Sequence, residues 1–96
     1  MTLDEFLRSV SENGPEASLS EPLRALWFDR KGDWDRAHQI AQGIPSPEGS
    51  WVHAYLHREE GDLWNARYWY QQAGRPESEG DLEAEWREIA GTLLAQ

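Results

Sequence analysis

The chain nearly repeats itself, and this repetition constrains its fold more than any other feature of the sequence. Residues 25–37 align without a gap over residues 54–66, at an offset of 29 residues from Ala25 to Ala54. Each copy has two helix-like stretches around a central Gly-Asp pair, which is typical of a turn between helices. One helical hairpin cannot bury its apolar face alone, so the repetition predicts helix pairs that stack on one another.

Start and stop signals divide the chain into six expected helices. Thr2 and Glu5 form a capping box before the first helix, which we expect to run until the Asn-Gly-Pro stop at residues 13–15. The expected N-caps of the following helices include Ser20, Asp33, Ser46 and Asp62. No stretch alternates with period two, so no strand is expected.

The expected fold is therefore one all-α domain over residues 1–96, with about six helices arranged as stacked antiparallel pairs. The two degenerate repeat units cover about residues 20–45 and 47–76, and a capping helix covers about residues 81–95. Because two units are fewer than the ~3 that a stable array usually needs, we expect either that the first and last helices act as caps or that two chains pack together. The six tryptophans are expected to supply core volume.

The fifth expected helix, residues 63–73, carries apolar or aromatic side chains on almost every side. A helix that is apolar all round is normally packed between neighbours. We therefore expect Ala66 and Tyr70 to face the fourth helix, and Trp64 and Tyr68 on the other side to receive the last helix. This arrangement would place the fifth helix at the centre of the domain.

Composition excludes several classes of partner and site. The net charge of −9 argues against nucleic acids and anionic membranes, which attract basic surfaces, whereas a basic protein partner is compatible with it. The absence of cysteine excludes disulfides and favours a reducing compartment. The acidic start and the lack of an apolar run of ~20 residues predict a cytoplasmic protein.

The chain has no motif for an activated catalytic group. No serine lies in a Gly-x-Ser-x-Gly elbow, and the glycines at the expected turns are followed by aspartates, which would repel phosphate. We expect no enzymatic activity and no cofactor.

Two histidines have the spacing of metal ligands. His53 and His57 are four residues apart on one expected helix face, and zinc or nickel would need one or two further ligands. The nearest candidates are Glu60 and, only through folding, His38. The alternative is that these histidines are partly buried and hydrogen-bonded without a metal.

The repeat resembles the tetratricopeptide family. The matching residues are small residues in the first helix, a glycine at the turn and small or aromatic residues in the second helix: Ala25, Ala54, Gly32, Gly61, Ala37, Ala66, Tyr70 and Ala73. The family's leucine and tyrosine positions carry His53 and His57, and the period is 29 instead of about 34 residues. Residues 51–76 are also similar to a segment of small bacterial proteins of this helical-hairpin type.

The resemblance implies a protein-interaction module, because tetratricopeptide domains hold a peptide on the inner face of their first helices. The matching positions here, which we term the inner face, are Trp51, Tyr55, Arg58, Glu59, Leu26, Asp29 and Arg30. Tryptophan, tyrosine and arginine are frequent anchors of interfaces. Two alternatives remain: Trp51 and Tyr55 lie buried under the first helix, or the aromatic surface forms a homodimer interface.

Overall fold

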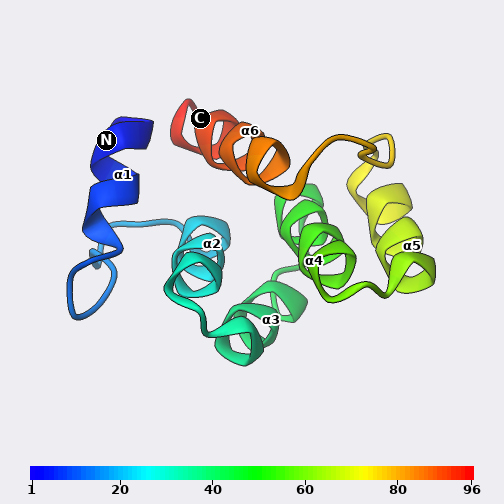
Figure 1. The fold of residues 1–96 in the computed structure, drawn as a ribbon, viewed down its shortest axis with the longest axis horizontal. Helices are drawn as coiled ribbons and strands as arrows, with labels where there is room; N and C mark the ends of the chain where they lie inside the picture. Colours follow the sequence, from blue (N-terminus) through cyan, green and yellow to red (C-terminus); the bar gives the residue numbers. More distant parts are fainter.

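The computed structural model describes residues 1–96 as six α-helices without a strand (Figure 1). The predicted all-α class is therefore confirmed. The helices are α1 (Leu3–Ser9), α2 (Glu21–Lys31), α3 (Trp34–Gln42), α4 (Pro47–Glu60), α5 (Leu63–Ala73) and α6 (Leu82–Leu94). No helix combines the length and the apolar character that crossing a bilayer requires.

Two Gly-Asp turns build the two helical hairpins, α2–α3 and α4–α5. Gly32 and Gly61 adopt φ of 97° and 90°, the left-handed region in which a side chain is strained. The following residues, Asp33 and Asp62, each accept a hydrogen bond from the backbone N–H three residues later and so start the second helix of the pair. The repeated sequence thus produces the same local structure twice.

The first helix is shorter than expected. The sequence predicts a helix up to residues 13–15, but α1 ends at Ser9. The Ser9 hydroxyl donates a hydrogen bond to the Phe6 carbonyl at 2.6 Å, so the side chain competes with the helical backbone for its partners. Beyond the helix, Lys31 Nζ donates to the Val10 and Glu12 carbonyls at 2.7 and 3.1 Å. A cation from α2 therefore satisfies carbonyls that a longer helix would have used.

The centre of the domain is α4, and the prediction that α5 occupies this place is wrong. α4 packs against α2, α3, α5 and α6, whereas α5 packs mainly against α4 (Figure 1). Val52, Ala54 and Leu56 on α4 are completely buried. In contrast, Trp64 and Tyr68 on α5 are 82% and 51% exposed, although both were expected to receive the last helix.

The course of α6 explains this difference. Residues 74–81 run back along α5, where Glu77 pairs with Arg67 at 3.1 Å, and α6 then lies against α1, α2 and α4 (Figure 1). Trp86 of α6 stacks on Phe6 of α1, with ring centroids 5.7 Å apart and planes 14° apart. The first and last helices thereby close the domain together, and the outer side of α5 stays uncovered.

The start of α4 has no room for a side chain at Gly49. A Cβ atom at this position would lie 2.5 Å from the Ile44 Cβ and 2.6 Å from the Ile44 carbonyl oxygen. We expect Gly49→Ala to lower the free energy of unfolding by about 1–3 kcal/mol, because the backbone of the preceding loop must shift. Urea unfolding followed by circular dichroism measures this loss.

Gly91→Ala is the matched control in α6. A Cβ atom at Gly91 would meet no other group within 4 Å. We expect this variant to gain up to ~1 kcal/mol, since alanine is the better helix former. Equal stabilities of Gly49→Ala and Gly91→Ala would contradict the close approach of Ile44 to α4.

Candidate functional site

The structure covers most of the predicted inner face. Four of its seven residues are buried, and α6 lies across the helices that carry them. The buried residues are Leu26, Asp29, Trp51 and Tyr55. The guanidinium of Arg75, in the segment after α5, also lies 3.7 Å from the centroid of the Trp51 ring. The role of the inner face in binding a partner stays a prediction.

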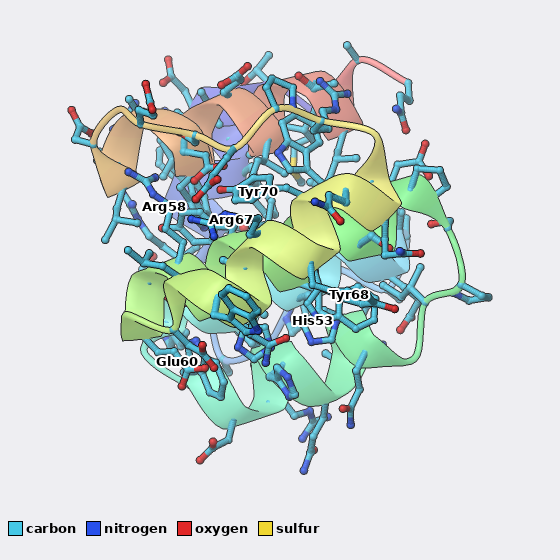
Figure 2. The ribbon with its side chains drawn as sticks, turned by 90° about the vertical axis from the view of Figure 1, so that its right-hand side faces the viewer. His53, Arg58, Glu60, Arg67, Tyr68 and Tyr70 are labelled. Carbon is cyan, nitrogen blue, oxygen red and sulfur yellow. The ribbon has the colours of Figure 1, made fainter.

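The two arginines of the inner face hold α6 in place. Arg58 pairs with Glu85 at 2.7 Å and also donates to the Gly80 carbonyl, while Tyr70 Oη donates to Glu85 at 2.5 Å (Figure 2). Arg30 binds both carboxylate oxygens of Glu83 at 2.5 and 2.9 Å. Both guanidinium groups are therefore engaged within the domain.

The last residue of the inner face, Glu59, lies beside the buried Asp29, so two acids are neighbours there. Burial, and then the neighbouring Glu59 carboxyl group, raise the pKa of Asp29 to about 9, while the smaller effect of Arg30 lowers it. Because this folded pKa lies above that of the unfolded chain, the folded state binds more protons between about pH 4 and pH 9. Asp29 therefore lowers the stability progressively as the pH rises through this range.

We expect Asp29→Asn to be more stable than the wild type at pH 8, by at least ~1 kcal/mol or about 4–8 °C in Tm, and equally stable near pH 4. Asparagine fits the same space and carries no charge to desolvate. Thermal unfolding of both proteins from pH 4 to pH 8 measures the effect. Parallel pH profiles would show that Asp29 is not protonated in the folded protein.

The outer side of α5 is the most exposed apolar surface. Trp64 and Tyr68, which we term the α5 face, are 82% and 51% exposed, and Leu63 at the start of the helix is 54% exposed. The guanidinium of Arg67 lies 6.0 Å from the Trp64 ring centroid, and Trp64, Arg67, Tyr68 and Gln71 line a shallow pocket. Figure 2 views the molecule from this side and shows Arg67 and Tyr68 on α5.

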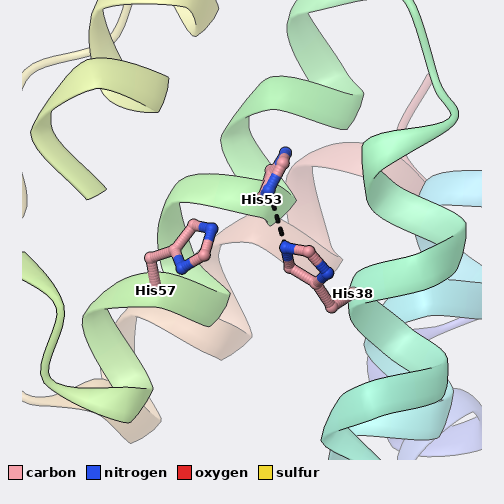
Figure 3. Close-up of side chains that lie close together, drawn as sticks. All are labelled: His38, His53 and His57. Carbon is pink, nitrogen blue, oxygen red and sulfur yellow. Dashed lines mark hydrogen bonds between the residues drawn. The ribbon is translucent and has the colours of Figure 1, made fainter. Parts of the chain in front are cut away.

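All three histidines of the chain meet between α3 and α4. We term His38, His53 and His57 the histidine cluster; their candidate ligand atoms lie within 4.8 Å of one another (Figure 3). The Nε2 atoms of His38 and His53 are 3.0 Å apart, and His57 Nδ1 lies 2.6 Å from Glu60 Oε2. The structure thus brings together both histidines of the predicted metal motif and both of their candidate companions.

Tryptophans hold two of the imidazole rings. Trp69 stacks on His53 with centroids 4.0 Å apart, and Trp34 stacks on His38 with centroids 4.9 Å apart. Burial is the main cause that lowers the pKa of both histidines, that of His53 to about 4. Burial therefore favours the neutral form of both rings.

Sequence reasoning missed the contribution of these tryptophans. The only available signal was the spacing of Trp34 and His38, which places them on the same side of α3. Contact between Trp69 and His53 depends on the packing of α5 against α4. No family model, curated protein or solved structure matches this chain.

Proposed function

We propose that this protein is a non-catalytic protein-interaction module whose contact surface is the α5 face. The observation that carries this proposal is the exposure of Trp64 and Tyr68, which lie one helical turn apart on α5 and border the same shallow pocket. Tryptophan, tyrosine and arginine dominate the binding energy of interfaces, and Arg67, which pairs with Glu77 at 3.1 Å, lies beside the Trp64 ring here. An exposed apolar patch on a small domain commonly marks an interaction site.

The arrangement of the helix pairs supports this choice of surface. In a helical-repeat stack each pair is covered by the next one. Here α6 leaves the end of the stack and returns to α1, α2 and α4. The α5 face is therefore the side on which a further helix would continue a tetratricopeptide-like stack. The inner face is a weaker candidate, since α6 already covers it.

The chemistry of the surface indicates the kind of partner. The α5 face offers apolar and aromatic contacts, so a partner segment with an apolar or aromatic side chain fits it. The net charge of −9 favours a basic partner through long-range attraction. We propose that the protein meets this partner in the cytoplasm, because a chain without cysteine suits a reducing compartment.

A double variant tests the proposal. Trp64→Ser/Tyr68→Ser removes both exposed aromatic rings, and Leu82→Ser changes an exposed apolar residue on α6 as the matched control. A protein captured from cell extract by the wild type is purified, and its affinity for all three proteins is measured by calorimetry. We expect the double variant to lose at least ~10-fold in affinity and the control to keep it, as for the loss of an interface hot spot.

Two outcomes would overturn this proposal. Equal affinities of the wild type and the double variant would exclude the α5 face as the contact surface. Sedimentation of the isolated protein is the second measurement. A concentration-dependent dimer that the double variant no longer forms would assign the α5 face to a second copy of this chain, in place of a different partner.

A further inference from the structure

We propose that the histidine cluster binds one divalent first-row transition-metal ion, of the group that includes Zn²⁺, Ni²⁺ and Cu²⁺. This site is independent of the α5 face and of the proposed protein partner. His38 comes from α3, whereas His53 and His57 come from α4 (Figure 3). The ion would therefore link the two helical hairpins.

The distances within the cluster suit such an ion. Zinc binds imidazole nitrogens at about 2.0–2.1 Å, so two ligands of a tetrahedral ion lie about 3.4 Å apart. The Nε2 atoms of His38 and His53 are 3.0 Å apart, and all three candidate ligand atoms lie within 4.8 Å of one another. Shifts of the nitrogen atoms, by a few tenths of an ångström for His38 and His53 and by up to about 1.4 Å for the widest pair, would bring all three to the separation of ligands on one ion.

The hydrogen bonds of the cluster leave suitable lone pairs. When His57 Nδ1 donates its proton to Glu60 at 2.6 Å, the Nε2 atom of the same ring is free to bind an ion. A carboxylate that accepts from the second nitrogen of a ligand histidine is the usual outer partner at metal sites. Between His38 and His53, one Nε2 donates and the other accepts, and an ion would replace this bond.

The surroundings favour a prearranged site over simple packing. His53 and His57 are almost completely buried, and Trp69 and Trp34 stack on His53 and His38. The rings are therefore held in place before an ion binds, as a selective site requires. The chain has three histidines, and all of them lie in this one cluster. Three imidazoles are the ligand set of an open zinc site, with the fourth position left to solvent.

Calorimetry on metal-free protein without a histidine tag tests this proposal directly, with ZnCl₂ and NiCl₂ as the probes. We expect saturable binding of one ion per chain. His38→Gln should weaken it at least ~10-fold, and Glu60→Gln should weaken it by about 10–100-fold, the usual effect of removing an outer partner. The matched control is Gln39→Ala, which changes an exposed neighbour of His38 on α3.

Tryptophan fluorescence gives a second readout at the same site. Ni²⁺ and Cu²⁺ quench nearby indoles, so Trp34 and Trp69 should lose emission when the site is filled. Trp34→Phe and Trp69→Phe should each reduce the quenched fraction without changing the number of ions bound. Circular dichroism of each variant confirms that it folds, and Glu60→Gln tests the site without changing a buried ring.

Three results would overturn the proposal. The first is the absence of saturable binding at one ion per chain. The second is binding of several ions that His38→Gln and Glu60→Gln leave unchanged, since this would place the ions on surface carboxylates. The third is one-to-one binding without quenching of Trp34 or Trp69 by Cu²⁺, because the ion would then lie elsewhere.

Discussion

Arg58→Met is expected to lower the free energy of unfolding by about 3–5 kcal/mol, because it leaves the Glu85 carboxylate buried without its cation. The side chains of Arg58 and Glu85 are 14% and 2% exposed, and their charged atoms are 2.7 Å apart. Tyr70 donates the other hydrogen bond to Glu85, and contact with this carboxylate contributes to the raised pKa of Tyr70 after burial itself. Urea unfolding followed by circular dichroism measures the loss.

A double variant separates the ion pair from the packing. In Arg58→Met/Glu85→Gln the buried charge is gone, and the glutamine can still accept a hydrogen bond from Tyr70. We therefore expect this variant to be more stable than Arg58→Met alone, which is a non-additive effect. Arg24→Met, which breaks an exposed pair with Glu21, is the control and should cost less than ~1 kcal/mol. Equal losses in Arg58→Met and Arg24→Met would contradict the buried network.

Trp86→Ala is the second variant with a large expected effect, a loss of about 3–5 kcal/mol. The Trp86 ring is 1% exposed, stacks on Phe6, and lies 4.6 Å below the guanidinium of Arg30. Its removal would leave a cavity where α1, α2 and α6 meet. Chemical unfolding followed by circular dichroism is the appropriate measurement, since the variant also loses a fluorophore.

Trp86→Phe should cost much less than Trp86→Ala. Phenylalanine keeps a ring against Phe6, and it also removes the Trp86 Nε1–H, which is buried without a hydrogen-bond acceptor. A loss below ~1 kcal/mol in Trp86→Ala would be small for the truncation of a core aromatic residue. It would show that the packing of α6 does not depend on the contact between Trp86 and Phe6. It would also reopen the inner face as a binding surface.

Local signals were sufficient to predict most helix boundaries. The Thr2 capping box, the N-cap serine at position 46 and the two Gly-Asp turns all depend on residues within four positions of one another. The exception was α1: besides the local hydrogen bond from Ser9, its end involves Lys31, which donates to carbonyls 21 and 19 positions away in the sequence. Short-range chemistry therefore predicted the elements, and failed where a distant side chain supplied the hydrogen bonds.

The candidate site was only partly predictable for the same reason. His53 and His57 are one helical turn apart, so their sequence spacing alone brings them together. His38 joins them because α3 packs against α4. Trp69 contacts His53 because α5 also packs against α4. The spacing along one helix could predict a pair of candidate ligands. It could not show that all three histidines of the chain lie in one cluster.

The sequence by itself determined the all-α class and the two helical hairpins, because caps, turns and apolar periodicity act over a few residues. Only the tertiary structure decided where α6 lies. The aromatic side chains on nearly all sides of α5 predicted that the last helix packs on its outer side, but buried contacts of Glu85 with Arg58 and of Trp86 with Phe6 hold α6 against α4 and α1. This position of α6 covers the inner face and leaves Trp64 exposed, since one amphipathic helix cannot cover both surfaces.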